Sequence, residues 1–398
     1  MTNKTIYLDN AATTKMSKTA IEAMLPFMDN VYGNPSSLHS VGQSAAEALY
    51  DARERIAKCL GCTAREITFT SGGSEADNQA ILSAAKIGSK KGKKHIISTA
   101  FEHHAVLHTL EKLKKQGFEI ELLSVGSRGN ITPELVEKAI KDDTCLVTVM
   151  YANNEIGSVM PISEIGEVCR KHNVPFHTDA VQAVGHLHID VNKQNIDMLS
   201  LSAHKFHGPK GIGALYCRQG ILLTNIIEGG AQERGKRAGT ENIPAIMGMA
   251  AALKESCSNI DENSEKISAL RNKLIDGLSK IPHSALNGDK KCRLPGNVNF
   301  CFEGIEGESL LLLLDAKGIC ASSGSACTSG SLDPSHVLLA IGRPHEVAHG
   351  SLRLSLCEWN TEEEIDYIIK STEEVVETLR SMSPMWKDLL SGKRKFIL

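Results

Sequence analysis

The chain has 398 residues, of which 41% are hydrophobic and 23% are charged, and its formal net charge is −3. This length suffices for two or three domains with a sizeable core, and the composition is typical of a globular enzyme. The near-neutral charge gives no electrostatic basis for direct binding of nucleic acid. The longest apolar run, residues 310–314, is too short to cross a membrane.

The N-terminal segment and the cysteines indicate the compartment. MTNKTIYLDNAATT lacks the apolar centre of a signal peptide. The 11 cysteines are odd in number and scattered, which argues against a disulfide framework and favours a reducing environment. Cys59 and Cys62 form a CxxC pair without the second pair of ligands that a zinc site needs. We therefore expect a cytoplasmic protein without a resident metal.

Short apolar runs alternate with helical patterns over the first two thirds of the chain. Helical patterns cover 44–60 and 105–117, for example. The apolar runs are EITFT (66–70), KHIIST (94–99), CLVTVMYA (145–152), VPFHTDA (174–180) and DMLSLSA (197–203). This alternation predicts an α/β fold, a mostly parallel sheet covered by helices on both faces.

The pattern changes near residue 260. An amphipathic helix is predicted over 262–281, strands over 297–302 and 349–356, and a last helix over 361–382. We expect a large domain over 15–260 and a smaller α+β domain over 261–398, with residues 1–14 packed against the smaller one. The basic tail, SGKRKFIL (391–398), is expected to be solvated, and docking of a protein partner is the alternative for it.

Polar residues follow several predicted strands. Gly73 and Ser74 lie in a turn that opens a helix, where free N–H groups can hold a phosphate. His103, Asn154 and Asp179 follow or end three other strands. The carboxyl ends of parallel strands share one edge of the sheet, so we expect these side chains to converge.

Lys205 follows the fifth predicted strand, between His204 and a glycine-rich turn. Burial there would disfavour its charge, and a neutral lysine forms a Schiff base with an aldehyde cofactor. Pyridoxal 5′-phosphate needs such a lysine, a carboxylate for its ring nitrogen and a phosphate cradle. Lys205, Asp179 and the SGGSE turn supply all three, whereas Lys205 alone would be read as a surface lysine.

A second candidate lies in GICASSGSACTSGSLDPS (318–335), a segment of small and polar residues that predicts an exposed loop. Cys327 lies in the middle of this segment. An exposed thiol is partly ionised at neutral pH and is nucleophilic. The alternative is a linker that happens to contain a cysteine.

Together these motifs resemble the cysteine desulfurases of the NifS/IscS type, which are fold-type-I pyridoxal-phosphate enzymes of the class-V aminotransferase family. The resemblance covers nearly the whole chain. It rests on YLDNAATT (7–14), NPSSLH (34–39), FTSGGSEADN (69–78), EHHAV (102–106), NNEIG (153–157), HTDAVQ (177–182), SAHKFHGPKGIGALY (202–216), ERGKRAGTEN (233–242), SSGSACTSG (322–330) and SLRLSL (351–356).

The resemblance implies roles at the cofactor. Lys205 corresponds to the Schiff-base lysine, and His103 to the imidazole that stacks on the cofactor ring. Asp179 would pair with the ring nitrogen, and Gln182 would bond to the phenolic oxygen. The residues implied near the phosphate are Gly73, Ser74, Ser202 and His204 of one subunit and Thr240 of the other subunit of a homodimer.

The resemblance also implies a reaction. Asn154 and Arg353 would bind the carboxylate of L-cysteine, with Asn34 in a motif near them. Cys327 would take the substrate sulfur as a persulfide, releasing L-alanine, and would pass the sulfur to an iron–sulfur scaffold protein or another acceptor. Cys327 could also be a transient ligand of an iron–sulfur cluster.

Three alternatives stay open on the sequence alone. One is a selenocysteine lyase, and another is a different fold-type-I lyase or aminotransferase in which Cys327 is incidental. The third is a catalytically silent subunit of a sulfur-assembly complex. The sequence does not distinguish iron–sulfur assembly from nitrogenase maturation, tRNA thiolation or thiamine synthesis.

Overall fold

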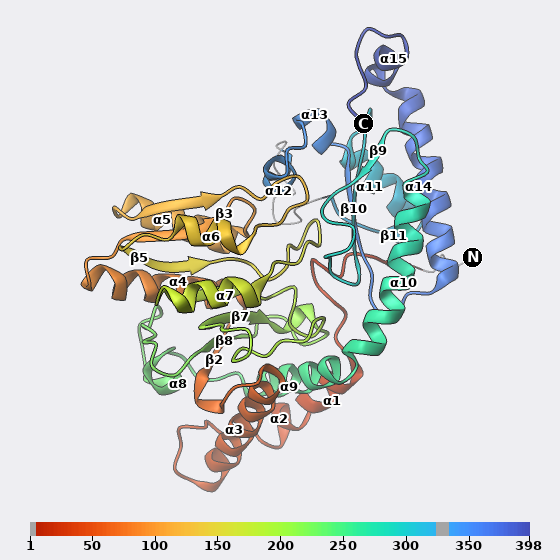
Figure 1. Ribbon diagram of the computed structural model, residues 1–398. Coiled ribbons are helices and arrows are strands. Elements are labelled where there is room, and N and C mark those ends of the chain that lie inside the picture. The colour runs from red at the N-terminus through yellow and green to blue at the C-terminus, as the bar shows by residue number, and fades with distance from the viewer. Residues whose placement is uncertain (1–4, 324–333) are drawn as a thin grey trace.

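The structure, a computed structural model, describes residues 5–323 and 334–398 (Figure 1). Its largest sheet has seven strands in the order β2-β8-β7-β6-β5-β3-β4. Strands β7, β6, β5, β3 and β4 run parallel, and β8 is antiparallel to both β7 and β2. The bounds are β2 (Ile67–Thr70), β3 (His95–Thr99), β4 (Glu119–Leu123), β5 (Thr144–Thr148), β6 (Phe176–Asp179), β7 (Met198–Ser202) and β8 (Gly213–Cys217). The prediction of a mostly parallel sheet is confirmed.

Helices cover both faces of this sheet, as the sequence predicts. On one face, α4 (Gly73–Lys90) and α5 (His104–Lys115) bury Ala80 and Leu110 in one apolar cluster. The opposite face carries a larger cluster, to which α3 (Ser40–Leu60), α6 (Pro133–Ala139), α7 (Ile162–Lys171) and α9 (Ile243–Ser258) contribute. Shorter helices on this side of the molecule are α1 (Lys18–Met24), α2 (Pro26–Asp29) and α8 (Gln232–Gly235). No helix within residues 5–323 and 334–398 combines the length and apolar character needed to cross a bilayer.

A second unit forms around a three-stranded antiparallel sheet, ordered β12-β10-β9. Helices α10 and α14 pack side by side along it (Figure 1), and together they enclose a separate apolar core. Its elements are β9 (Ser284–Leu286), β10 (Asn297–Phe302), β12 (Ser351–Ser355), α10 (Ile260–Leu278), α11 (Gly307–Ala316) and α14 (Glu362–Met382). We propose that this unit is the smaller domain that the sequence predicts.

The N-terminus joins this second unit. Strand β1 (Ile6–Tyr7) pairs in parallel with β11 (Ile319–Cys320), and Ile6 and Leu8 are buried in the second core. The chain then passes to the large sheet, so residues 9–14 lie between the two units. Two short helices, α12 (His336–Ala340) and α13 (His345–Ala348), follow β11 along the chain.

The basic residues of the C-terminal tail are exposed, as expected, but the end of the tail is also held against its own chain. After α15 (Pro384–Leu390) the chain folds back, and Phe396 stacks on His283 with ring centroids 3.8 Å apart. The backbone N–H groups of Ile397 and Leu398 donate to the carboxylate of Glu303 at 2.9 Å and 3.0 Å. The apolar residues that follow the basic ones therefore anchor the tail to its own chain.

Candidate active site

A cavity of about 300 Å³ opens where β5, β6 and β7 end, beside the N-terminus of α4. The convergence that the sequence predicts therefore holds. The predicted site residues that line it are Gly73, Ser74, His103, Asn154, Asp179, Gln182, Ser202, His204, Lys205 and Arg353.

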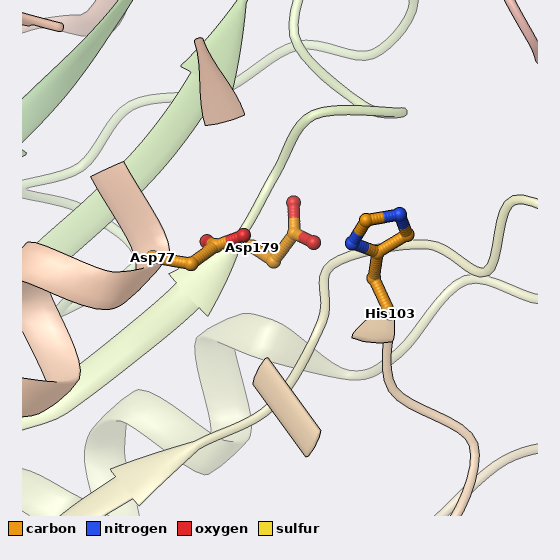
Figure 2. Close-up of side chains that lie close together, drawn as sticks. All are labelled: Asp77, His103 and Asp179. Carbon is orange, nitrogen blue, oxygen red and sulfur yellow. The ribbon is translucent and has the colours of Figure 1, made fainter. Parts of the chain in front are cut away.

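Two carboxylates and an imidazole meet inside the cavity (Figure 2). One carboxylate oxygen of Asp77, one of Asp179 and a ring nitrogen of His103 all lie within 4.8 Å of one another. Asp179 ends β6, is 7% exposed, and accepts a hydrogen bond from Val181 N–H at 3.0 Å. Burial raises the pKa of Asp179, whereas the Val181 N–H and Lys205 favour its ionised form. The Asp179 carboxylate is therefore already shielded from water, and a cationic group bound beside it would interact with it strongly.

Two imidazoles on the cavity wall are neutral. His103 is the N-cap of α5, and its Nδ1 accepts from Ala105 N–H at 3.1 Å. Burial is the main cause that lowers the pKa of His103. Burial and the neighbouring lysines lower the pKa of His204 to about 4, and its Nδ1 lies 3.1 Å from Thr13 Oγ1. Neutral rings can stack on an aromatic group or donate a hydrogen bond without adding charge.

Lys205 ends a single turn of 3₁₀ helix directly after β7. Its Nζ donates to the carbonyl oxygens of Ala11 and Ala12 at 2.6 Å and 2.7 Å. The turn is tight, because a Cβ at Gly208 would lie only 2.8 Å from the Ala203 Cβ. Residues 11 and 12, which come from the N-terminal segment, thus aim the lysine into the cavity.

The N-terminus of α4 forms another wall. The first N–H groups of a helix have no partner inside the helix, so they are available to an anion. A Cβ at Gly73 would lie 2.5 Å from Val181 Cγ2, so only glycine fits there. Ser74 follows in the first turn of α4. Ser202 faces this end of α4 from β7, and its Oγ lies 3.7 Å from where a Cβ at Gly72 would be.

Arg353 brings the second unit into the cavity. It lies on β12, and its side chain is 1% exposed. Its Nη2 contacts Asp9 Oδ1 at 2.9 Å, and its Nη1 donates to Asn154 O at 3.3 Å. Its Nε has no hydrogen-bond partner among the described residues. A planar guanidinium with a spare donor suits a ligand carboxylate.

Two predicted site residues among the described ones do not line this cavity. Asn34 is exposed, and its Oδ1 accepts from Ser36 N–H at 2.9 Å. Thr240 is also exposed, in the loop between α8 and α9. Cys327 lies outside the described residues. The structure therefore leaves the roles predicted for these three residues as predictions.

Two lining residues were not singled out from the sequence. His336 of α12 lies against His104, with ring centroids 4.7 Å apart, and its Nε2 contacts Glu102 O at 2.9 Å. Asp77 lies one helical turn after Ser74 on α4, and this i,i+3 spacing is the signal that could have found it. Nothing local marks His336, because it reaches the site only through tertiary packing.

The fold and the cavity define a class of protein. A mostly parallel sheet with a lysine, a buried aspartate and a helix N-terminus at the strand ends is the arrangement of a fold-type-I pyridoxal-phosphate enzyme. The aminotransferase class-V family model matches residues 6–368. The chain belongs to this family, whose enzymes use pyridoxal 5′-phosphate, the cofactor that the sequence predicts.

Individual relatives agree with this assignment. The chain is 54% identical over 396 residues to a cysteine desulfurase IscS of Clostridium botulinum, covering 99% of this chain and 100% of the relative. A solved NifS-like protein matches with a TM-score of 0.88 at 38% identity, and the match covers 94% of this chain and 100% of the solved chain. A structure described as SspA in complex with cysteine has a TM-score of 0.78 at 37% identity, covering 89% of this chain and 99% of its own.

Proposed function

We propose that the protein is a cysteine desulfurase, which converts L-cysteine to L-alanine and retains the sulfur as a persulfide on Cys327. The observation that carries the proposal is that Lys205, Asp179, His103 and Arg353 line one cavity. The relative that is 54% identical along its whole length and bears this activity in its name supports the proposal.

The cavity fits pyridoxal phosphate on its own geometry. Burial disfavours the charge of the Asp179 carboxylate. The protonated ring nitrogen of the cofactor would provide a cationic partner that stabilises this charge. A Cβ at Gly73 would clash with Val181, which explains the glycine at the start of α4. This start of α4, Gly73 and Ser74, would hold the phosphate together with Ser202. Lys205 would hold the cofactor covalently through Nζ, leaving its present carbonyl partners.

The bound cofactor would supply an electron sink that weakens the bonds at the α-carbon of the substrate. The protein side of the reaction follows from the cavity. Arg353 would bind the substrate carboxylate, and its contact with the half-buried Asp9 fixes the direction in which its guanidinium points. His103 accepts from Ala105 N–H at Nδ1, so the proton of its neutral ring lies on Nε2 and can be donated there.

The nucleophile proposed for the sulfur transfer is Cys327, which lies outside the described residues. The thiolate of Cys327 would form the new S–S bond while the carbon–sulfur bond of L-cysteine breaks, and the carbon fragment would leave as L-alanine after taking up a proton. The outer sulfur of the persulfide would then pass to an iron–sulfur scaffold protein or another acceptor. This part of the proposal rests on the SSGSACTSG motif.

We further propose that the enzyme is a homodimer. Large apolar side chains on and around α1, α2 and α3 are exposed, a pattern that marks an interaction surface. They are Leu25 at 57%, Met28 at 59%, Tyr32 at 74%, Leu38 at 91% and Tyr50 at 56% exposure. The exposure of Thr240, which lies outside its own cavity, agrees with a role in the cavity of the partner.

The test is spectroscopic and chemical on the purified protein. We expect an absorption band near ~420 nm from cofactor bound to Lys205, and equal amounts of alanine and sulfide after addition of L-cysteine and dithiothreitol. C327S is expected to keep the band and lose sulfur transfer. A band without sulfide would move the function to another lyase or an aminotransferase, and the absence of a band would favour a silent assembly subunit. Turnover of selenocysteine without turnover of cysteine would favour a selenocysteine lyase.

A further inference from the structure

A second buried carboxylate stands next to Asp179. Asp77 lies on α4, and its side chain is 1% exposed. Figure 2 shows it pointing from α4 toward Asp179, which comes from the end of β6. Both residues line the cavity, and no role for Asp77 follows from the motifs in the sequence.

The surroundings of Asp77 offer little that would stabilise a negative charge. Its Oδ1 has no hydrogen-bond partner among the described residues. The nearest ring nitrogen is His177 Nε2, at 3.6 Å. Burial lowers the pKa of His177 to about 3, so this ring is neutral. The two nitrogens of His177 already contact Thr148 Oγ1 at 2.8 Å and Ser200 Oγ at 2.9 Å.

The surroundings of the two aspartates differ. Lys205 and the N–H of Val181 favour the ionised form of Asp179. Asp77 faces two other acids, Asp179 and Glu102, and only a hydrogen bond with Ser200 favours its ionised form. Burial and the charge on Asp179 therefore raise the pKa of Asp77 well above its ordinary value.

Two carboxylates that share a buried site cannot both be ionised at low cost, and one of them keeps a proton. We propose that this proton resides on Asp77, and that the neutral Asp77 allows Asp179 to keep its charge toward the ring nitrogen of the cofactor. The inference rests on the proposed function for the role of Asp179. Asp77 is thus a positioning residue that acts through Asp179.

Carbon-13 NMR of enzyme labelled only at the aspartate carboxyl carbon reports this proton directly. We expect one aspartate resonance in the chemical-shift range of a protonated carboxyl group between pH 6 and pH 8. Asp77→Asn should remove this resonance, and the exposed control Asp142→Asn should retain it. A wild-type spectrum without such a resonance, or its persistence in Asp77→Asn, would overturn the inference whatever the variant does to folding.

Thermal unfolding of the apoenzyme gives a second readout with a defined sign. A raised pKa in the folded state means that stability is lost as the pH rises from the unfolded pKa toward the folded one. Asparagine stays neutral, so the melting temperature of Asp77→Asn relative to wild type should rise steadily above about pH 4. A constant difference across this range would contradict a protonated Asp77.

Cofactor binding separates this inference from the proposed function. Asp77→Asn imitates the protonated acid, so it should keep the absorption band and bind pyridoxal phosphate with nearly the wild-type affinity. Asp179→Asn removes the charge itself and should weaken cofactor binding by about 10- to 100-fold. A wild-type protein that binds no cofactor would refute the proposed function, while the NMR spectrum of that protein would still test the proton on Asp77.

Discussion

A buried ion pair between Arg53 and Glu233 provides a strong test of how the loop that carries Thr240 is held. Arg53 Nη1 and Nη2 each contact one carboxylate oxygen of Glu233 at 2.6 Å. The two side chains are 9% and 1% exposed. The same carboxylate accepts from Phe69 N–H at 3.0 Å, and the guanidinium lies 4.5 Å from the Phe69 ring centroid.

The backbone at this point is strained. Glu233 has φ +50° and Arg234 has φ +59°, both in the left-handed region that side chains other than glycine rarely occupy. Such residues cost on the order of 1–3 kcal/mol each and persist only where the surrounding contacts fix them. The ion pair with Arg53 is the contact that fixes Glu233, and the chain runs on from there to Thr240.

Glu233→Met removes the carboxylate and leaves the Arg53 charge buried without its partner. Breaking a buried pair in this way costs about 3–5 kcal/mol. The unfolding entropy is about 2.1 cal/mol/K per residue. For a chain that unfolds as one unit, this free-energy loss corresponds to a fall in melting temperature of about 4–6 °C. The measurement is differential scanning calorimetry of the purified variant at a fixed protein concentration.

A double-mutant cycle shows whether the pair itself is responsible. Arg53→Met should cost a similar amount, and the double variant should be less destabilised than the sum of the two single variants. The control is Glu22→Ala, which breaks an exposed pair at 3.5 Å and should move the melting temperature by less than about 1 °C. Additive single variants, or a fall of under about 1 °C for Glu233→Met, would refute the reasoning.

Three further predictions concern the site and the contact between the two units. Lys205→Ala should abolish the visible absorption band, and a variant that keeps the band after gel filtration would exclude Lys205 as its source. Arg353→Lys should raise the KM for L-cysteine by about 10- to 100-fold with the band intact, because lysine lacks the planar fork; an unchanged KM would place the substrate carboxylate elsewhere. Glu358 lies 3.4 Å from His207 and raises its pKa. The raised pKa means that this stabilisation is complete below about pH 6.5 and is lost as the pH rises through the folded value. Glu358→Gln should therefore cost most near pH 6 and least above pH 8 in thermal unfolding, whereas a pH-independent cost would contradict a charged pair.

The sequence predicted the architecture because the signals for it are local. The apolar runs predicted over 174–180 and 197–203 are β6 and β7, within two residues at each end. The rule that polar residues at strand ends converge placed Lys205, Asp179 and Asn154 in one cavity, as the structure has them. The run predicted as a strand over 145–152 was too long, because β5 ends at Thr148, although Val149 and Tyr151 still donate backbone hydrogen bonds to His177 and Asp179 beside it.

What could not be predicted depends on contacts between distant segments. The reversed direction of β8 leaves no mark in its own sequence, because a buried antiparallel strand is as apolar as a parallel one. The charges of the tail correctly predict that its basic residues are exposed, but nothing in them predicts that Phe396 stacks on His283. Asp77 was not predicted because an acid on a helix usually faces water, and here the packing of α4 on the sheet buries it.

The position of residues 9–12 between the two units has a consequence for the order in which the chain is made. Ala11 and Ala12 hold Lys205, and Asp9 holds Arg353, so the start of the chain contacts groups made much later. During synthesis on the ribosome, the seven-stranded sheet is complete once β8 has emerged. The guanidinium that faces the cavity is added more than a hundred residues afterwards. If Arg353 binds the substrate carboxylate, as proposed above, a nascent chain carries Lys205 before it has that group, and turnover requires synthesis to continue past Arg353.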